Sequence, residues 1–562
     1  MTDTLKICLA QLNPTLGDIE GNLAKIRTAR AEAAAQGADL VVASEMYLTG
    51  YPAEDLVLKP MFLDRVDDAL KVLAAETADG GPGLLIGAPW REDKSARAPL
   101  RGKVFNAAVL MDGGEVLGTR YKHELPNYGV FDEVRLFAAG PLNGPMNFRD
   151  VRLGVMVCED MWFPDVSECL MESGAEILVC INGSPYELEK EDERLQLGVA
   201  RVLETELPVI YVNQVGGQDE LVFDGGSYVL SSARELRVQL AMFSEAWVLT
   251  EWARGEDGVW NCEEGPRVAP TPKLETVYSA LVLGLRDYVE KNRFPGVLLG
   301  LSGGIDSALS AAIAVDALGA DRVHCVMMPS PYTSAESLED AAEAAKLLGV
   351  KLDSVSIEPA MGAFDRMVTP LFNGTAPGIT EENIQSRSRG LTLMALSNKL
   401  GHMVLSTGNK SEVSVGYATL YGDMCGGYNV LKDLYKTTVF ELSRWRNQSQ
   451  AAGLLGPEGR VIPERIITKP PSAELKPDQK DEDSLPPYDK LDDILECLIE
   501  GEAGVDEIVA RGHDRETVNR IWRLLELAEY KRRQAAPGVK ITRRAFGRDR
   551  RYPITNAFKG PL

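Results

Sequence analysis

The sequence is poor in the residues from which many catalytic and structural metal sites are built. It has four histidines, His123, His324, His402 and His513, which are too scattered to form an evident metal triad or a Ser-His-Asp signature. Its eight cysteines are spread along the chain without a CxxC pair, so the spacing suggests neither a disulfide framework nor a zinc knuckle. We therefore expect any nucleophile in this chain to work without a histidine base.

The chain also lacks long hydrophobic runs and an excess of positive over negative charge. No 18 apolar residues run together, and the start of the chain lacks a basic segment followed by an apolar stretch. The net charge of −23 disfavours nucleic acid as a partner, because its phosphates would be repelled. With 45% hydrophobic and 25% charged residues, the composition predicts a globular cytoplasmic protein with no membrane partner.

The length and the pattern of apolar segments predict two domains. A chain of 562 residues exceeds what one hydrophobic core usually serves. Up to about residue 250, short apolar runs alternate with amphipathic segments, and the runs 104–111 and 115–121 are one turn apart, as in an antiparallel hairpin. This pattern predicts a mixed α/β domain over 1–255. The Gly-, Pro- and charge-rich stretch 256–272 is predicted to be a linker to a second domain over 273–562.

The second domain alternates helices and apolar strands. Helices predicted over 272–293, 306–319 and 334–348 are separated by the strands GVLLGLS and RVHCVMMP and followed by LDSVSI. This order is typical of a doubly wound, Rossmann-like parallel sheet, whose ligands bind beyond the carboxyl ends of the strands. The segment 469–487 is rich in Pro, Asp and Lys, and we interpret it as a mobile loop that serves as a lid.

A glycine turn follows the first strand of that domain. The residues SGGIDS at 302–307 lie between a strand and a helix, where backbone N–H groups and the helix dipole favour an anion such as phosphate. The lysine of the GxxxxGK[ST] loop is missing. The motif resembles the ATP pyrophosphatase family, which cleaves ATP between the α- and β-phosphates; the alternative is a plain capped turn. The resemblance implies ATP contacts from Gly300, Leu301, Ser302, Gly303, Gly304, Ile305, Asp306 and Ser307.

A second loop, TGNKSE at 407–412, follows another apolar strand. We expect Glu412 to face Asp306 across the top of the sheet, where two carboxylates and phosphate oxygens would suit Mg²⁺. Taken alone, the loop would be interpreted as a helix cap with a surface charge.

Five motifs in order resemble NAD synthetases: SGGIDS, ENIQSR, TGNKSE, YGDMCGGYNVLKDLYKT and PGVKITRRAFGRDRRYPI. The resemblance implies that Thr407 contacts ATP and that Asp306 and Glu412 hold magnesium. It implies that Asn383, Glu412 and Lys540 contact deamido-NAD, with Asp423 and Lys436 in the same pocket. Nine basic residues within 531–551 could attract the phosphates of the dinucleotide, or most of them could be solvated surface charges.

The first domain has a cysteine at a strand end. Cys158 follows the run VRLGVMV, and although a buried cysteine is usually a small hydrophobe, a strand end can present its sulfur to a pocket. A cysteine nucleophile needs a base and a neighbouring cation. Glu45 and Lys122 also follow predicted strands and are candidates for these roles.

The segments SEMYLTGYP, YKHELPNYGVFDE and VMVCEDMWFP resemble the nitrilase superfamily over about the first 250 residues. The resemblance implies a nitrilase-like α/β sandwich in which Glu45 accepts the proton of Cys158 and Lys122 stabilises the oxyanion, with Glu133 assisting. It also implies that Tyr128, Ser184 and Lys190 hold glutamine, although Lys190 also fits an exposed charged helix.

The combination of the two domains narrows the function. Together with the resemblance to NAD synthetases, which alone implies deamido-NAD as the acceptor, it predicts an enzyme that hydrolyses glutamine. The ammonia would amidate deamido-NAD through an adenylated intermediate, with ATP and Mg²⁺, and the enzyme would be a homo-oligomer. The runner-up is a glutamine-dependent amidotransferase that acts on another carboxylate. A non-catalytic scaffold would be expected to have lost Glu45, Lys122 or Cys158, and all three are present.

Overall fold

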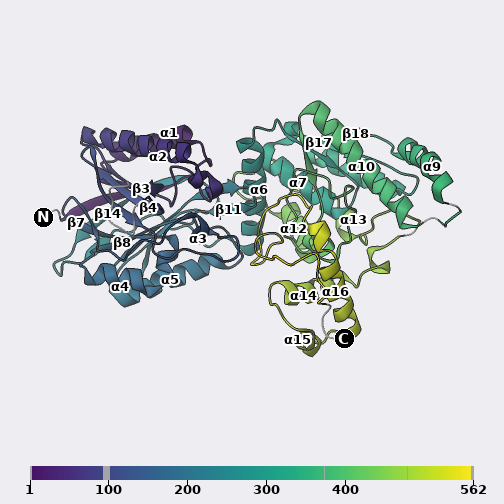
Figure 1. Ribbon diagram of the computed structural model, residues 1–562. Helices are drawn as coiled ribbons and strands as arrows, with labels where there is room; N and C mark the ends of the chain where they lie inside the picture. The colour runs from purple at the N-terminus through teal and green to yellow at the C-terminus, as the bar shows by residue number, and fades with distance from the viewer. Residues whose placement is uncertain (1–2, 93–101, 373, 377, 478, 559–562) are drawn as a thin grey trace. The chain divides into compact units, whose positions relative to one another are not determined.

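The structure is a computed structural model that describes residues 3–92, 102–372, 374–376, 378–477 and 479–558. It divides into two compact units, Met1–Pro270 and Thr271–Leu562 (Figure 1). Among the described residues, no helix is both long enough and apolar enough to cross a membrane.

The first unit contains two large sheets. The seven-stranded sheet has the order β15 (Trp260–Cys262), β14 (Ala246–Arg254), β1 (Thr4–Gln11), β2 (Leu40–Ala43), β3 (Gly83–Arg91), β4 (Val104–Asp112) and β5 (Glu115–Tyr121). The six-stranded sheet has the order β13 (Leu236–Gln239), β12 (Tyr228–Leu230), β9 (Val209–Asn213), β8 (Ile177–Asn182), β7 (Val151–Val157) and β6 (Met146–Phe148). A separate hairpin joins β10 (Val215–Gln218) and β11 (Leu221–Asp224).

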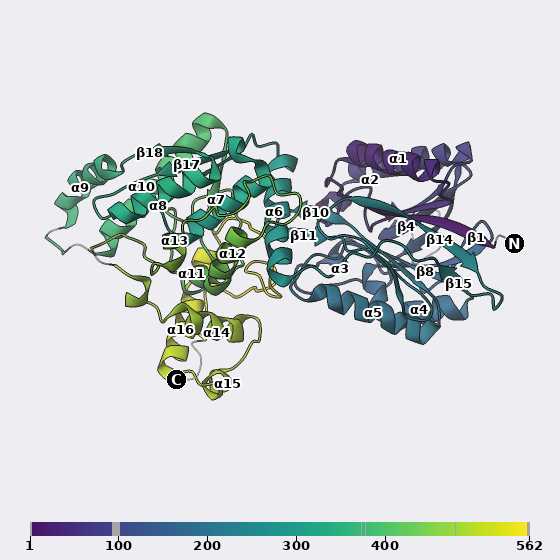
Figure 2. The ribbon, with the colours of Figure 1, turned by 180° about the vertical axis from the view of Figure 1, so that it is seen from behind.

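Alternating apolar residues make these sheets pack face to face. Ile7, Leu9 and Val42 from one sheet and Val155 and Val179 from the other share one buried cluster. Helices α1 (Ile19–Ala35) and α2 (Pro60–Glu76) cover the outer face of the first sheet, and α4 (Pro164–Glu172) and α5 (Lys190–Thr205) cover the second (Figures 1 and 2). The predicted nitrilase-like α/β sandwich with a mixed sheet is therefore confirmed.

The short helical segments of this unit are η1 (Glu54–Leu58), η2 (Thr77–Asp79), α3 (Glu133–Leu136) and η3 (Cys158–Met161). The structure differs from the linker expected over 256–272 at β15, which pairs with β14. Trp260 and Cys262 are buried on either side of the exposed Asn261, and this short alternation places the strand in the sheet.

The second unit is built on one parallel sheet. Its order is β18 (Lys351–Ser354), β17 (Val323–Met327), β16 (Val297–Gly300), β19 (Met403–Ser406) and β20 (Tyr428–Asn429). The chain runs outward from β16 in one direction to β18 and then crosses back to β19 on the other side, so the switch point lies between β16 and β19. The predicted doubly wound fold is confirmed.

Helices pack on this sheet and beyond it. They are α6 (Lys273–Lys291), α7 (Ile305–Leu318), η4 (Ala320–Arg322), α8 (Ala335–Leu348), α9 (Glu358–Phe372), α10 (Ile379–Leu400), α11 (Lys410–Val415), α12 (Lys436–Gln448), α13 (Glu464–Thr468), η5 (Asp481–Asp483), α14 (Tyr488–Ile499), α15 (Val505–Ala510), α16 (Arg515–Leu527) and α17 (Glu529–Arg532). Leu393 of α10 packs against Leu298 and Val404 of the sheet. Helices α14, α15 and α16 share a separate apolar cluster (Figure 2).

Candidate active sites

Cys158 lies where β7 ends and η3 begins. Its φ is +47°, so the chain turns sharply there in the left-handed region that non-glycine residues seldom adopt. The buried Asp160 holds this turn, because its carboxylate accepts backbone N–H groups from Val157 at 3.0 Å and from His123 and Glu124 at 2.9 Å. The turn is thus tied to the residues that follow Lys122.

Glu45, Lys122 and Glu133 meet in the interior of the first unit. The Lys122 Nζ donates to Glu45 Oε1 at 2.8 Å and to Glu133 Oε1 at 3.0 Å, and all three side chains are at most 3% exposed. Asn106 Nδ2 donates to Glu45 Oε1 at 2.6 Å, and the Gly183 N–H donates to Glu45 Oε2 at 2.7 Å. These contacts hold the Glu45 carboxylate in one orientation.

The charges of this cluster, together with its burial, shift the pKa values of its members. Burial alone would lower the pKa of Lys122, but the carboxylates of Glu133 and Glu45 outweigh it and keep that pKa well above its usual value. Burial raises the pKa of Glu133 to about 7, against the opposing effect of Lys122. Burial, followed by the charge of Glu45, raises the pKa of the Cys158 thiol. The thiol is therefore protonated in the free site and needs a base to become a nucleophile.

The three residues predicted to hold glutamine have different surroundings. Tyr128 is 54% exposed, and its hydroxyl donates to Glu159 Oε1 at 2.9 Å. Lys190 begins α5, and its Nζ lies 5.9 Å from the ring centres of both Phe131 and Trp162. Ser184 is 4% exposed in the turn between β8 and α5.

Sequence analysis missed several residues of this site. Glu159 directly follows the candidate nucleophile, and burial raises the pKa of its carboxyl. Tyr51 donates to Glu133 Oε1 at 2.8 Å, beside the Asn106 and Gly183 contacts to Glu45. Glu159 and Tyr51 had a sequence signal, because they lie within the quoted segments VMVCEDMWFP and SEMYLTGYP. Asn106 and Gly183 come from segments outside the quoted motifs.

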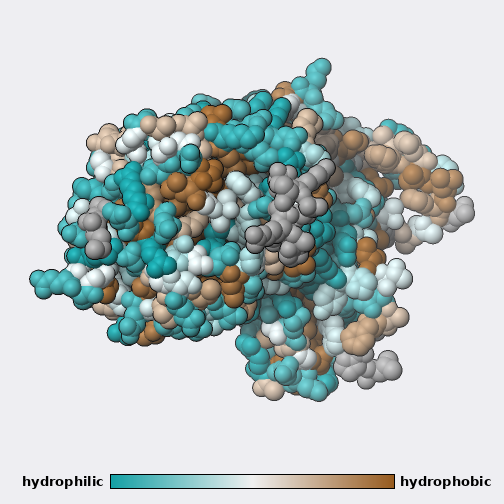
Figure 3. All heavy atoms as spheres, turned by 60° about the vertical axis from the view of Figure 1, so that its left-hand side comes forward, coloured by the Kyte–Doolittle hydropathy of each residue, from teal (hydrophilic) through white to brown (hydrophobic). Residues whose placement is uncertain are grey.

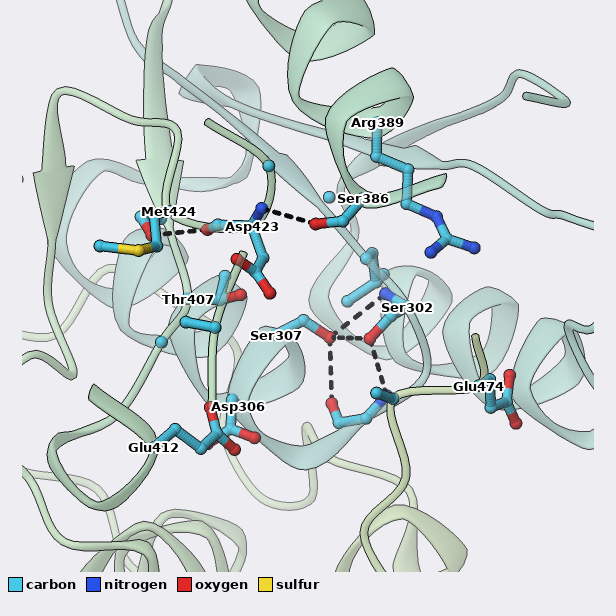
Figure 4. A pocket seen from close by; sticks show the side chains of 18 of the residues that line it. Ser302, Asp306, Ser307, Ser386, Arg389, Thr407, Glu412, Asp423, Met424 and Glu474 are labelled. Carbon is cyan, nitrogen blue, oxygen red and sulfur yellow. Dashed lines mark hydrogen bonds between the residues drawn. The ribbon is translucent and has the colours of Figure 1, made fainter. Parts of the chain in front are cut away.

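The second unit has a cavity of about 330 Å³ beyond the carboxyl ends of β16 and β19. Figure 4 shows side chains from the loops after both strands facing it. The predicted ATP contacts that line it are Gly300, Leu301, Ser302, Gly304, Ile305, Asp306, Ser307 and Thr407. The predicted residues Glu412, Asp423 and Lys436 also line it.

The loop after β16 is held by its own hydroxyl groups. Ser307 Oγ accepts the Ser302 N–H at 3.2 Å and donates to the Gly304 carbonyl at 3.0 Å, and the Gly304 N–H donates to Ser302 Oγ at 3.2 Å. Gly303 has a φ of +80°, and a Cβ there would lie 2.3 Å from the Ser337 carbonyl oxygen. The loop therefore passes too close to α8 for any side chain at this position.

Asp306 and Glu412 lie next to each other, as Figure 4 shows, and share one cation. Lys436 Nζ is 2.5 Å from Asp306 Oδ2 and 2.9 Å from Glu412 Oε1. The Asn409 side chain joins the two loops, since its Nδ2 donates to Asp306 Oδ1 at 2.8 Å and its Oδ1 accepts the Glu412 N–H at 3.0 Å. Burial raises the pKa of Glu412 to about 7, against the opposing charge of Lys436.

Two residues predicted to contact deamido-NAD lie outside the lining of this cavity. Asn383 accepts a hydrogen bond from Thr419 Oγ1 at 3.1 Å. Lys540 is 4% exposed and donates to the Thr542 carbonyl at 2.6 Å, with Asp549 at 3.1 Å. Of the basic residues within 531–551, Arg532 and Arg550 are buried against Glu529 and are not solvated surface charges.

The segment 469–487 forms part of the cavity wall. Lys469, Glu474 and Asp481 all line it, and Lys469 Nζ contacts Asp340 at 2.9 Å. Glu474 Oε1 accepts hydrogen bonds from the hydroxyls of Ser334 and Ser337, both at 2.8 Å. The described residues of the segment, which leave out 478, form no long helix or strand, as the composition predicted, and the segment is docked onto α8.

Comparisons with known proteins cover both units. The carbon-nitrogen hydrolase family model matches residues 6–253, and the NAD synthase family model matches residues 277–535. The chain is 53% identical to the glutamine-dependent NAD(+) synthetase of Rhodobacter capsulatus over 100% of both chains, and 44% identical to that of Acinetobacter baylyi over 99% of both. A structure of the Acinetobacter baumannii glutamine-dependent NAD+ synthetase in complex with ADP is 43% identical, with a TM-score of 0.77 over 99% of both chains.

Proposed function

The chain belongs to the glutamine-dependent NAD(+) synthetase family, and from this premise we propose how its own residues divide the reaction. The first unit hydrolyses glutamine to glutamate and ammonia. The boundary between the two units lies near residues 255–272. The second unit uses the ammonia to convert deamido-NAD to NAD. One observation carries the assignment of the first site. Lys122 and Glu45 form a buried contact, and Cys158 lies at the end of a strand in the same unit.

Glutamine hydrolysis proceeds through a thioester at Cys158. Glu45 accepts the thiol proton, and the resulting thiolate attacks the amide carbon of glutamine. Lys122 donates a hydrogen bond to the oxyanion that forms. The proton passes to the leaving nitrogen, ammonia departs, and a water deprotonated by Glu45 then releases glutamate. Glu133 keeps Lys122 charged and in place during both steps.

Recognition of glutamine uses charges of both signs. Lys190 supplies a cation for the α-carboxylate, and Ser184 supplies a hydroxyl. Tyr128 closes the site through its bond to Glu159, whose buried carboxylate suits the α-ammonium group. These roles are supported by the chemistry of each side chain and, for Tyr128, by its bond to the residue that follows Cys158.

ATP binding falls to the loop after β16. Its backbone N–H groups and the start of α7 attract phosphates, and Thr407 supports the nucleotide from the loop after β19. The β-phosphate and γ-phosphate leave together as pyrophosphate, and the carboxylate of deamido-NAD is adenylated. Ammonia then displaces AMP to form the amide.

The residues at the end of the cavity fit a magnesium ion. Asp306 and Glu412, which share the Lys436 ammonium group, offer two oxygen ligands. Among the described residues no group of three or more His, Cys, Asp or Glu side chains could hold a metal ion. The remaining ligands would be phosphate oxygens of ATP. Bound there, Mg²⁺ would neutralise the charge of the phosphates. Glu412, Asn383 and Lys540 are the residues that we assign to deamido-NAD.

The test compares the wild-type protein with Cys158→Ala in NAD formation from deamido-NAD, ATP and Mg²⁺. We expect the variant to lose the reaction driven by glutamine and to keep the reaction driven by ammonium, because only the first step needs the thiol. Cys169→Ala, a half-buried cysteine of the same unit, is the matched control. If wild-type protein makes no NAD from either nitrogen source, the acceptor is a different carboxylate.

We also propose that the protein is a homo-oligomer. The described part of α9 has no buried residue, and Phe364, Met367 and Leu371 lie along one side of it with exposures of 37%, 67% and 76%. In Figure 3 hydrophobic side chains gather on the right-hand side of the view, where α9 lies. A second copy of the chain would cover this face.

A further inference from the structure

A buried arginine outside the proposed catalytic set organises the turn that carries Ser184. Arg194 lies one turn into α5 and is 4% exposed. Its Nη1 donates to both carboxylate oxygens of Asp224 at 2.8 Å. Its Nη2 donates to the carbonyls of Ser184 at 3.0 Å and Pro185 at 2.7 Å, and its Nε donates to Ser184 Oγ at 3.1 Å. Every N–H of the guanidinium is therefore used.

These contacts leave one hydrogen-bonding group of Ser184 available, the hydrogen of its hydroxyl. Asn213 Oδ1 accepts the Ser184 N–H at 3.0 Å, and Asn213 Nδ2 donates to the Ser184 carbonyl at 3.1 Å. The hydroxyl oxygen already accepts the Arg194 Nε–H. Within the described ranges, no group accepts a hydrogen bond from that hydroxyl, so its proton is available to a ligand. The backbone of the turn cannot rotate to change this arrangement without breaking several buried hydrogen bonds.

The arrangement selects the kind of group that Ser184 can meet. A hydroxyl that accepts from a guanidinium directs its own hydrogen elsewhere, and so it favours an anionic acceptor over an ammonium group. Asp224 neutralises the charge of Arg194, so the arginine orients the hydroxyl without competing as a free cation. The positive charge that such an anion needs is the one we assigned to Lys190, which begins the same helix.

We propose that Arg194 is a positioning residue that makes Ser184 a hydrogen-bond donor to the α-carboxylate of glutamine. The inference rests on the proposed glutaminase function of the first unit and on the proposed contact of Ser184 with glutamine. It adds a specificity-determining pair, Arg194 and Asp224, to that site. The hydrolysis of an amide without an α-carboxylate should then not depend on Arg194.

The experiment measures hydrolysis of two amides, glutamine and 4-aminobutanamide, which is glutamine without its α-carboxylate. Arg194→Lys cannot reach both Asp224 and Ser184, and we expect it to lower kcat/KM for glutamine about 10- to 100-fold, mainly through KM. For 4-aminobutanamide we expect a change of no more than about threefold. Arg201→Lys, a buried arginine on the same helix that bonds the Met161 carbonyl, should leave the ratio of the two activities unchanged.

A double-mutant cycle with Ser184→Ala separates positioning from general stability. If Arg194 acts through the hydroxyl, Arg194→Lys should have little further effect on glutamine once Ser184 is alanine. Equal losses for both amides, or additive losses in the double variant, would overturn the proposal. If Arg194→Lys does not fold, Asp224→Asn is assayed with the same two amides, because it weakens the ion pair with Arg194 without changing the size of the side chain.

The same variants tell this inference apart from the proposed function. Glutaminase activity in Cys158→Ala would refute Cys158 as the nucleophile, and wild-type protein without glutaminase activity would refute the proposed function of the first unit. If Cys158→Ala is inactive and Ser184→Ala lowers the activity on both amides equally, the role of Ser184 is wrong and the inference fails with it. If Ser184→Ala selectively lowers the activity on glutamine and Arg194→Lys does not, only the inference about Arg194 fails.

Discussion

At the scale of single residues, charge balance decides the state of the amidase site. Lys122 supplies one positive charge to the two carboxylates of Glu45 and Glu133, and all of them are buried. Ionising both carboxylates would leave a net negative charge in a region of low dielectric constant, which is costly. Burial accordingly raises the pKa of Glu133 to about 7, and this carboxyl titrates near neutral pH.

The raised pKa of Glu133 predicts a pH dependence of stability. The unfolded carboxyl ionises near its usual pKa of 4.5, whereas the folded one ionises at about 7. Between these values the unfolded state binds fewer protons, so the free energy of unfolding falls as pH rises and then levels off above about 7. Urea unfolding of Glu133→Gln between pH 5 and pH 8 should show a weaker fall than the wild type. Glu32→Gln, an exposed control, should keep the wild-type slope, and a Glu133→Gln slope equal to it would contradict the prediction.

At the scale of elements, two segments shape the cavity that we propose binds ATP. The turn between β16 and α7 brings backbone N–H groups to the cavity, and the segment 469–487 docks on α8 beside it. Both segments depend on close contacts with α8, through Gly303 and Ser337 for the turn and through Glu474 for the docked segment.

Gly303→Ala should abolish NAD formation with either nitrogen source. Its Cβ would lie 2.3 Å from the Ser337 carbonyl oxygen, so the turn would have to move away from the phosphate position. Gly319→Ala at the other end of α7 is the control, because it has a similar φ of +82° but meets no atom within 4 Å. Steady-state assays with ammonium should show a loss of at least about 100-fold for Gly303→Ala alone. Similar losses in both variants would mean that backbone strain, and not the collision, is responsible.

Glu474→Ala should loosen the docked segment and weaken ATP binding. The variant removes two hydrogen bonds from the Ser334 and Ser337 hydroxyls, and Glu474 has a φ of +48° that these contacts help to maintain. Loss of hydrogen bonds to a charged group predicts a KM for ATP about tenfold higher, measured with ammonium as the nitrogen source. Glu482→Ala, an exposed residue in the same segment, should have an unchanged KM. An unchanged KM in Glu474→Ala would show that the segment stays docked without this carboxylate.

At the scale of the whole molecule, each unit has its own sheet system and its own proposed chemistry. The family membership that the motifs predicted is confirmed by two family models and by relatives that match along the full chain. The runner-up, an amidotransferase for another carboxylate, is not favoured by these relatives.

Self-association is the prediction at this scale. Met367→Glu combined with Leu371→Glu places charges on the exposed apolar side of α9 and should shift sedimentation towards a smaller species. Leu203→Glu, on an exposed position of α5 in the first unit, should sediment like the wild type. If the double variant also sediments like the wild type, α9 is not part of the interface.

The sequence by itself determined the two domains' fold classes and the loops that carry their motifs. Apolar alternation predicted the strands. Cys158 was found because it directly follows one of them, and Asp306 and Glu412 because they lie in the loop-to-helix motifs that come after two others. Local patterns suffice there, because side-chain periodicity and strand ends are set by short-range geometry. The roles of these residues remain predictions.

Only the tertiary structure decided which distant residues complete each site. Arg194, Asp224 and Asn213 meet at Ser184, and Lys436 bridges two loops, because strands far apart in sequence lie side by side in the sheets. Asn383 and Lys540 were expected to contact deamido-NAD, yet they lie outside the lining of the cavity, Asn383 in a half-buried bond with Thr419 and Lys540 in buried contacts with Thr542 and Asp549. The physical reason is that a side chain buried with its hydrogen bonds satisfied depends on partners whose distance along the chain no local pattern encodes.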